Sequence, residues 1–122
     1  MRLSFYWYPN CSTCKNAKKW LDEHEVDYTA IHIVEETPSQ EEILHFIETS
    51  GLPAKRFFNT NGKKYRELNM KEKIKDATIE EMAAFLASDG MLIKRPITTD
   101  GKKTTVGFKP EIFEETWAAN DN

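Results

Sequence analysis

The sequence predicts an α/β fold, a small mixed sheet with a helical insertion, in the order βαβ, helices, ββα. Three observations predict it. An amphipathic segment lies between two apolar segments near the start, capping boxes follow, and two short β-like segments near the end meet at a turn signal. Because 122 residues suit one core, we expect a single domain over 1–122, with the helical insertion at roughly 38–90.

The first forty or so residues make up the predicted βαβ unit. Residues 2–8 are apolar and aromatic, which favours a strand. Residues 15–25 are predicted to be helical, and residues 26–34 return to β character. The helix is predicted from apolar side chains at i, i+3 and i+4, which are Ala17, Trp20 and Leu21.

The middle of the chain is predicted to be helical. Ser39 and Thr78 each begin a capping box, with a glutamate three residues further on. Gly51 is expected to end the first of these capped helices. The predicted helical segments are 41–50, a short helix within 52–58, a broken helix over 63–75, and 79–87.

The last part of the chain is predicted to form a hairpin and a helix. Residues 91–97 are expected to be a short apolar strand interrupted by Lys94-Arg95-Pro96, Asp100-Gly101 a turn, and residues 104–108 the returning strand. A short helix is expected to begin at 109–111 and to precede a polar tail at 120–122. Its expected inner side chains are Ile112, Phe113 and Trp117.

The motif that carries chemistry is Cys11-Ser12-Thr13-Cys14, between the first predicted strand and helix. If Asn10 or Cys11 caps the helix, the Cys11 sulfur lies beside unpaired N–H groups and the positive end of the helix dipole. Both favour the thiolate, so we expect Cys11 to be nucleophilic near neutral pH. Cys14 is expected to be more buried, and close enough to form a disulfide and resolve an adduct at Cys11. Lys15 can help to hold an anion at this helix end.

In a chain without export signals, this arrangement is typical of a thioredoxin-like redox motif. Two alternatives stay open. The cysteines can be half of a zinc site, although there is no second Cys pair and the three histidines show no ligand spacing with them. The two cysteines can also be unreactive and lie three residues apart by coincidence. The strand–turn–helix context argues against this alternative.

Composition limits the expected partners and location. Charged residues make up 30% of the chain and the formal net charge is −3, so we expect no direct binding to nucleic acid. The first ten residues contain no long apolar run, so we expect no signal peptide and no membrane association. Two cysteines without an export signal indicate a reducing compartment, and we expect the cytoplasm.

A second informative segment is Lys94-Arg95-Pro96. A proline at a strand can be cis, which fixes the backbone of its neighbours in a tight geometry. Arg95, directly before it, would then be a rigidly placed donor for a tetrahedral oxyanion or a carboxylate. Alternatively, Arg95 simply pairs with an Asp or Glu on the surface.

With the C-x-x-C turn, the Trp20-Leu21 helix and the segment 92–97 (LIKRPI), the sequence resembles the arsenate reductase (ArsC)/Spx family over about 3–113. The resemblance implies a thioredoxin-like sheet with a helical insertion between the second and third strands. It also implies that Cys11 is the nucleophile, Arg95 the oxyanion-binding arginine, and Pro96 a cis proline beside the active site.

The sequence departs from the glutathione-dependent arsenate reductases, which have three arginines around the thiolate. Only Arg95 has an evident counterpart, since Asn59 stands at the earlier arginine position and Thr105 or Val106 at the later one. Those reductases also lack a second cysteine in the turn and have an arginine where this chain has Lys15. We therefore count Lys15, Lys94 and Pro96 as candidate anion-binding residues.

The leading functional prediction is a thiol–disulfide oxidoreductase of the arsenate reductase family. Cys11 attacks a small-molecule or protein disulfide, Cys14 resolves the adduct, and thioredoxin, glutaredoxin or glutathione donates electrons, with no bound cofactor. In the specific version the substrate is arsenate, held by Arg95 and the helix N-terminus. The alternative is a redox-sensing transcriptional regulator like Spx, which binds the RNA polymerase α subunit. Spx proteins usually have Arg-Arg-Pro where this chain has Lys94 before the Arg-Pro pair.

Overall fold

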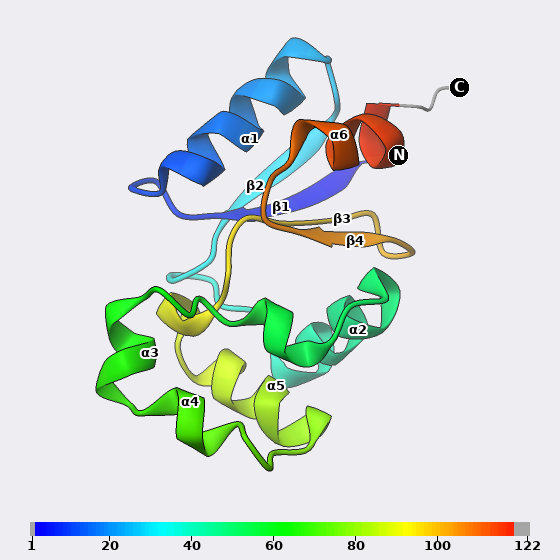
Figure 1. Cartoon of the computed structure of the whole chain (residues 1–122). Coiled ribbons are helices and arrows are strands. Elements are labelled where there is room, and N and C mark those ends of the chain that lie inside the picture. Colours follow the sequence, from blue (N-terminus) through cyan, green and yellow to red (C-terminus); the bar gives the residue numbers. More distant parts are fainter. Residues whose placement is uncertain (1, 119–122) are drawn as a thin grey trace.

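The computed structural model of the chain describes residues 2–118, so the polar tail predicted at 120–122 lies outside the described residues. A mixed sheet with strand order β2-β1-β3-β4 lies at its centre (Figure 1). Its strands are β1 (Leu3–Trp7), β2 (Tyr28–His32), β3 (Ile97–Thr99) and β4 (Thr104–Val106). β1 and β2 are parallel, whereas β3 is antiparallel to both β1 and β4. The predicted α/β class with a mixed sheet is confirmed.

Helices surround this sheet in the predicted order. α1 connects β1 to β2, and the helical insertion connects β2 to β3. The α-helices are α1 (Ser12–Glu23), α2 (Gln40–Ser50), α3 (Lys63–Glu67), α4 (Met70–Lys73), α5 (Ile79–Ser88) and α6 (Pro110–Phe113). Short 3-10 turns, η1 (Ala54–Phe57) and η2 (Gly90–Leu92), and a π-helical turn, η3 (Glu114–Ala118), complete the described chain.

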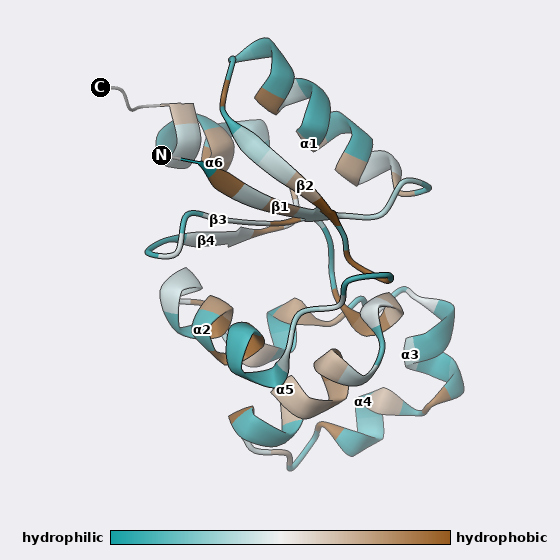
Figure 2. Ribbon diagram, turned by 180° about the vertical axis from the view of Figure 1, so that it is seen from behind, coloured by the Kyte–Doolittle hydropathy of each residue, from teal (hydrophilic) through white to brown (hydrophobic). Residues whose placement is uncertain are grey.

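The sheet is covered on both faces, by α1 and α6 on one and by the insertion on the other (Figure 1). Because side chains alternate along a strand, Leu3 and Phe5 of β1 pack toward α1 and α6 while Tyr6 packs into the insertion. The α1 ribbon is largely hydrophilic with interspersed hydrophobic positions (Figure 2). Its buried residues are Cys14, Ala17, Trp20 and Leu21.

Both capping boxes form as the sequence predicts. The Ser39 hydroxyl accepts from the Glu42 N–H at 3.1 Å, and the Glu42 carboxylate accepts from the Ser39 N–H at 2.8 Å. Thr78 and Glu81 repeat the arrangement at α5. Gly51 ends α2 in the left-handed region, with φ 71°, where a residue without Cβ has no steric cost.

Of the predicted strand over 91–97, only Ile97 lies in a strand, and Ile93 forms an isolated antiparallel bridge with Phe58 of the insertion. Residues 90–92 form a 3-10 turn, and the Lys94 N–H donates to the Phe57 carbonyl oxygen at 2.7 Å rather than to β1. The Asn59 N–H likewise donates to the Leu92 carbonyl oxygen at 2.8 Å. The insertion therefore takes the hydrogen bonds that would have extended the strand, and β3 begins at Ile97.

Two smaller predictions near the end of the described chain are also wrong. The returning strand ends at Val106 instead of 108, because Gly107 has φ 80° and turns the chain away. Ile112 is 40% exposed and not on the inner side of α6. Phe113 and Trp117 fill that inner side, and both are buried as predicted.

Candidate active site

The candidate active site begins at the N-terminus of α1, where Cys11 is the capping residue. The Cys14 N–H donates to Cys11 Sγ, with 3.3 Å between nitrogen and sulfur. The Cys11 N–H in turn donates to the Tyr8 carbonyl oxygen at 3.0 Å. Of the two caps that the sequence allowed, Asn10 and Cys11, the structure has Cys11. The sulfur therefore lies against the first-turn N–H groups, at the positive end of the helix dipole.

The two cysteines lie in different environments, and both are free thiols. Cys11 is half-buried, whereas Cys14 is fully buried under α1. Burial, followed by the hydrogen bond to Cys11, raises the pKa of Cys14 to about 12, and the nearby Arg95 guanidinium opposes part of this rise. Cys14 therefore holds its proton at neutral pH.

Arg95 lies beside this cysteine pair, supported by Tyr8. The Arg95–Pro96 peptide bond is cis, as the resemblance implied. The Arg95 guanidinium carbon lies 4.9 Å from the centroid of the Tyr8 ring, a cation–π distance. Arg95 Nη1 is buried and has no hydrogen-bond partner among the described residues, so this donor is free to bind an anion. The ion pairs found within residues 2–118 do not include Arg95.

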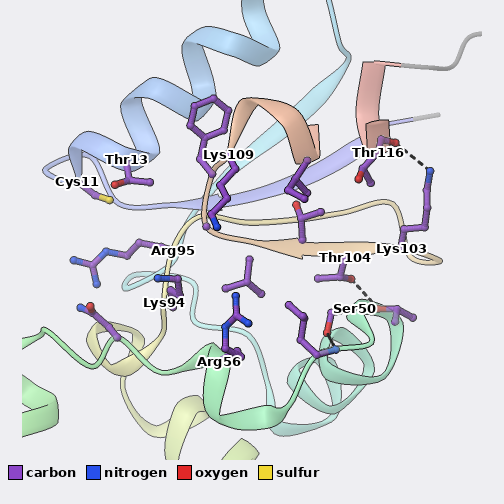
Figure 3. A pocket seen from close by; sticks show the side chains of 18 of the residues that line it. Cys11, Thr13, Ser50, Arg56, Lys94, Arg95, Lys103, Thr104, Lys109 and Thr116 are labelled. Atoms are coloured by element: carbon purple, nitrogen blue, oxygen red, sulfur yellow. Dashed lines mark hydrogen bonds between the residues drawn. The ribbon is translucent and has the colours of Figure 1, made fainter. Parts of the chain in front are cut away.

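Cys11 and Arg95 line a groove of about 900 Å³ between the insertion, β4 and the segment that leads into α6 (Figure 3). Five cationic side chains line this groove, and none of its lining residues is an Asp or Glu. The cations are Arg56, Lys94, Arg95, Lys103 and Lys109. Because the whole chain has a formal net charge of −3, this concentration of positive charge is a local feature of the groove.

The structure brings some of the predicted site residues together and leaves others outside the groove. Cys11, Lys94 and Arg95 line it, while Cys14 is buried behind Cys11 and Pro96 is buried at the start of β3. Lys15 is exposed and is not among the lining residues. By the resemblance, Asn59 stands at one arginine position of the glutathione-dependent reductases and Thr105 or Val106 at the other, and all three residues line the groove.

Sequence reasoning missed several residues of the site. Arg56, Lys103 and Lys109 come from different elements, and nothing in their spacing along the chain indicates that they face one groove. The sequence predicts Tyr8 only as the end of a strand. In the structure its ring contacts the Arg95 guanidinium, and its carbonyl oxygen accepts a hydrogen bond from the Cys11 N–H. The signal that could have pointed to Tyr8 is its position directly before the C-x-x-C turn.

Within residues 2–118, no group of three or more His, Cys, Asp and Glu side chains is arranged to hold a metal ion. Nor does any helix of the described chain have the length and apolar character needed to cross a membrane.

Comparison with known proteins assigns the family, because the model of the ArsC family matches residues 6–116. The chain belongs to the ArsC family. It is 60% identical to the uncharacterized protein YusI of Bacillus subtilis over 118 residues, which are 97% of this chain and all of YusI. It is also 30% identical to the regulatory protein MgsR of Bacillus subtilis over 109 residues, which are 89% of this chain and 85% of MgsR.

Solved structures agree with this assignment. The crystal structure of an ArsC family related protein from Bacteroides fragilis superposes with a TM-score of 0.90 at 47% identity. The superposition covers 94% of this chain and 97% of the other. The chain therefore has the thioredoxin-like fold of the ArsC family, with its cysteine turn at the start of α1 and its Arg-Pro peptide at the start of β3.

Proposed function

We propose that this ArsC-family protein is a thiol–disulfide oxidoreductase, with Cys11 as the nucleophile and Cys14 as the resolving cysteine. The observation that carries the proposal is the 3.3 Å contact between the Cys14 N–H and Cys11 Sγ, combined with the fact that only Cys11 reaches the groove. A groove-lining sulfur at a helix N-terminus with a buried thiol one turn further is the arrangement that thiol–disulfide exchange requires.

The reaction has two exchange steps. The Cys11 thiolate attacks one sulfur of a substrate disulfide, a Cys11–substrate bond forms, and the displaced sulfur leaves as a thiolate that takes a proton from water. Cys14 then loses its proton and attacks Cys11 Sγ. The Cys11–Cys14 disulfide forms, and the second substrate sulfur leaves as a thiol after protonation.

Two electrons thus pass from the cysteine pair to the substrate. A thiol reductant such as thioredoxin, glutaredoxin or glutathione returns them by the same chemistry, so the protein needs no bound cofactor. Arg95, with its unpaired buried Nη1, would bind an anionic group of the substrate near the reacting sulfur. We place this activity in the cytoplasm, where thiol reductants keep such a pair reduced.

Trapping tests the two roles. With a disulfide substrate, Cys14→Ser should accumulate a mixed disulfide at Cys11, seen as added mass on the intact protein. Cys11→Ser should form no such adduct. In the wild-type chain, mild peroxide should join Cys11 to Cys14 within one molecule. If peroxide yields only intermolecular dimers, Cys14 does not resolve adducts and the proposal fails.

A second candidate function is redox-dependent transcriptional regulation, favoured by the 30% identity to the regulatory protein MgsR. In this version the Cys11–Cys14 disulfide changes a surface that binds the RNA polymerase α subunit, as the resemblance to Spx implies. A pull-down with purified α subunit under oxidising and reducing conditions distinguishes the two functions. A regulator binds in one redox state without turnover, whereas an oxidoreductase turns over with a reductant and does not need the subunit.

A further inference from the structure

The groove is much larger than a tetrahedral oxyanion requires. Its volume of about 900 Å³ is near the upper end of the range of about 300–1,000 Å³ that is typical of pockets for drug-sized ligands. Cys11 and Arg95 lie toward one end, and Lys103 and Thr116 toward the other (Figure 3). An anion bound beside Cys11 would occupy one end only, so the rest of the groove suits a longer ligand.

The charges along the groove favour an acidic ligand. Arg56, Lys94 and Lys109 take part in none of the ion pairs found within residues 2–118. Lys103 donates to the Thr116 carbonyl oxygen at 3.1 Å and lies over the Trp117 ring, so it too keeps its charge uncompensated by a carboxylate. Cations gathered along one groove without carboxylates raise the local concentration of anionic ligands.

The groove also contains an edge of the sheet, where Thr104 is buried against α2 and Thr105 and Val106 are half-buried. β4 is the last strand in the order β2-β1-β3-β4, and residues 104–107 line the groove in succession. Thr98 of β3 pairs with Thr105 of β4. Two residues away in either direction, the Gly107 N–H donates to the Pro96 carbonyl oxygen and the Asp100 N–H donates to the Lys103 carbonyl oxygen. These bonds identify which residue pairs along the two strands are the hydrogen-bonded ones. In an antiparallel pair the intervening residues direct their N–H and C=O groups away from the partner strand.

Those intervening residues on β4 are Thr104 and Val106. Within the described chain, their outward backbone groups form no hydrogen bond to another segment. A row of unpaired N–H and C=O groups is a template for an added strand, and extended peptides bind other proteins in this way.

We propose that the groove binds an extended acidic peptide segment, which adds to the edge of β4 and presents a disulfide-bonded cysteine to Cys11. The carboxylates of the segment contact Arg56, Lys109 and Lys103. The inference rests on the proposed oxidoreductase function and names its substrate class, an acidic segment of an oxidised protein. A peptide is favoured over a nucleic acid because only a peptide backbone has the alternating donors and acceptors that match a strand edge.

Single-turnover kinetics test the substrate class. Ten-residue peptides carry one cysteine as a mixed disulfide with 2-thiopyridine, flanked by aspartates, by serines or by lysines. Cys11 attacks the cysteine sulfur and 2-thiopyridone leaves, which is followed by its absorbance. At low salt the aspartate peptide should react at least about tenfold faster than the serine peptide, and the lysine peptide more slowly, with the differences shrinking as salt is added.

The outcomes separate the two proposals. Equal rates for aspartate and serine peptides overturn the groove inference and leave the oxidoreductase standing. Rates no higher than those of Cys11→Ser with every peptide refute the oxidoreductase. Arg56→Gln and Lys109→Gln should each reduce the ratio of the aspartate-peptide rate to the serine-peptide rate by about two- to fivefold, the contribution of an exposed ion pair. The matched control Lys55→Gln removes an exposed neighbouring charge outside the groove lining and should change neither rate.

Binding without chemistry tests the groove independently of turnover. The chain with both Cys11→Ser and Cys14→Ser is titrated into a fluorescent aspartate peptide and followed by anisotropy. Two further peptides carry methyl groups on alternate backbone nitrogens, one on the odd-numbered and one on the even-numbered residues. One of the two should bind at least about tenfold more weakly, because methylation removes the N–H donors that face the strand edge. Unchanged binding of both methylated peptides, or tighter binding of a single-stranded oligonucleotide of equal charge, overturns the proposal.

Discussion

Cys11 and Cys14 are three positions apart in the chain, yet their surroundings differ in every respect that controls sulfur chemistry. Cys11 Sγ accepts a backbone N–H and lines a cationic groove. Cys14 is fully buried, with its pKa raised to about 12 by burial and by the hydrogen bond to Cys11. The pair therefore has one sulfur suited to attack from solvent and one that reacts only with its neighbour.

This difference predicts unequal alkylation. After a short iodoacetamide pulse at neutral pH, Cys11 should be modified at least about tenfold faster than Cys14, because only the thiolate is the nucleophile. Peptide mass spectrometry of the quenched protein measures both sites. A urea-unfolded sample is the control, in which the two rates should become equal. Equal rates in the folded protein would contradict the assignment of Cys11 as the attacking sulfur.

The raised pKa of Cys14 also predicts how the resolving step depends on pH. At any pH well below about 12, the thiolate fraction of Cys14 rises about tenfold per pH unit. Resolution of a preformed mixed disulfide at Cys11 should therefore accelerate by about a hundredfold over the two pH units between pH 7 and pH 9. Stopped-flow release of the bound thiol measures it, and Cys14→Ser should show no release. A flat profile would show that Cys14 is already ionised when it attacks.

At the scale of the elements, the site depends on where the insertion joins the sheet. The segment before the Arg-Pro peptide is hydrogen-bonded to the insertion, through Lys94 and Phe57 and through Asn59 and Leu92. Gly90, at the start of the turn η2 that also contains Leu92, packs against the chain just after β2. A Cβ atom at Gly90 would lie 2.2 Å from the Ile33 carbonyl oxygen, which is backbone and cannot move aside freely.

Gly90→Ala should therefore destabilise the fold by about 3 kcal/mol, the upper part of the usual cost of overpacking. Urea unfolding measures the free energy of unfolding. Gly101→Ala is the matched control, since a Cβ there meets nothing within 4 Å and the cost is only that of its positive φ, about 1–2 kcal/mol. If the two variants lose the same stability, the close approach at Gly90 does not limit the packing of the insertion.

At the scale of the whole molecule, the groove combines the half-buried Arg95 with exposed cations, which are Arg56, Lys94, Lys103 and Lys109. A tetrahedral oxyanion needs several fixed donors close to the thiolate, and loss of one donor typically costs about 10²–10³ in rate. Arg95 lies against the Tyr8 ring, but by the resemblance Asn59 and either Thr105 or Val106 stand where the glutathione-dependent reductases have their other two arginines. Lys94 and Arg56 line the groove as further cations.

Arsenate reduction by this protein should accordingly be weak or absent. Arsenite production by the purified chain, supplied with thioredoxin or glutaredoxin systems, measures it. Turnover of about 1 s⁻¹, the low end of ordinary enzymes, would contradict the expectation. In that case Arg95→Ala should abolish arsenate turnover while the Cys11–Cys14 disulfide still forms, because Arg95 binds the anion and takes no part in sulfur exchange. Arg66→Ala, on a residue outside the groove lining, is the control.

Much of this protein follows from its sequence alone, because the governing interactions are local. The capping boxes at Ser39 and Thr78, the end of α2 at Gly51 and the position of Cys11 at the start of α1 each depend on residues within one helical turn. The α/β class follows from the periodicity of apolar residues, and the Arg-Pro motif with the C-x-x-C turn indicates the family over most of the chain.

Only the tertiary structure decided the features that depend on contacts between distant segments. Residues 91–93 have the apolar character of a strand, but the Lys94 N–H donates to the Phe57 carbonyl oxygen, and β3 begins only at Ile97. The cationic groove assembles Arg56, Lys103 and Lys109 from separate elements, and Lys15, one residue from Cys14, is left outside it. Sequence spacing specifies the direction of a side chain within its own element, whereas the packing of insertion, sheet edge and α6 determines which side chains share a site.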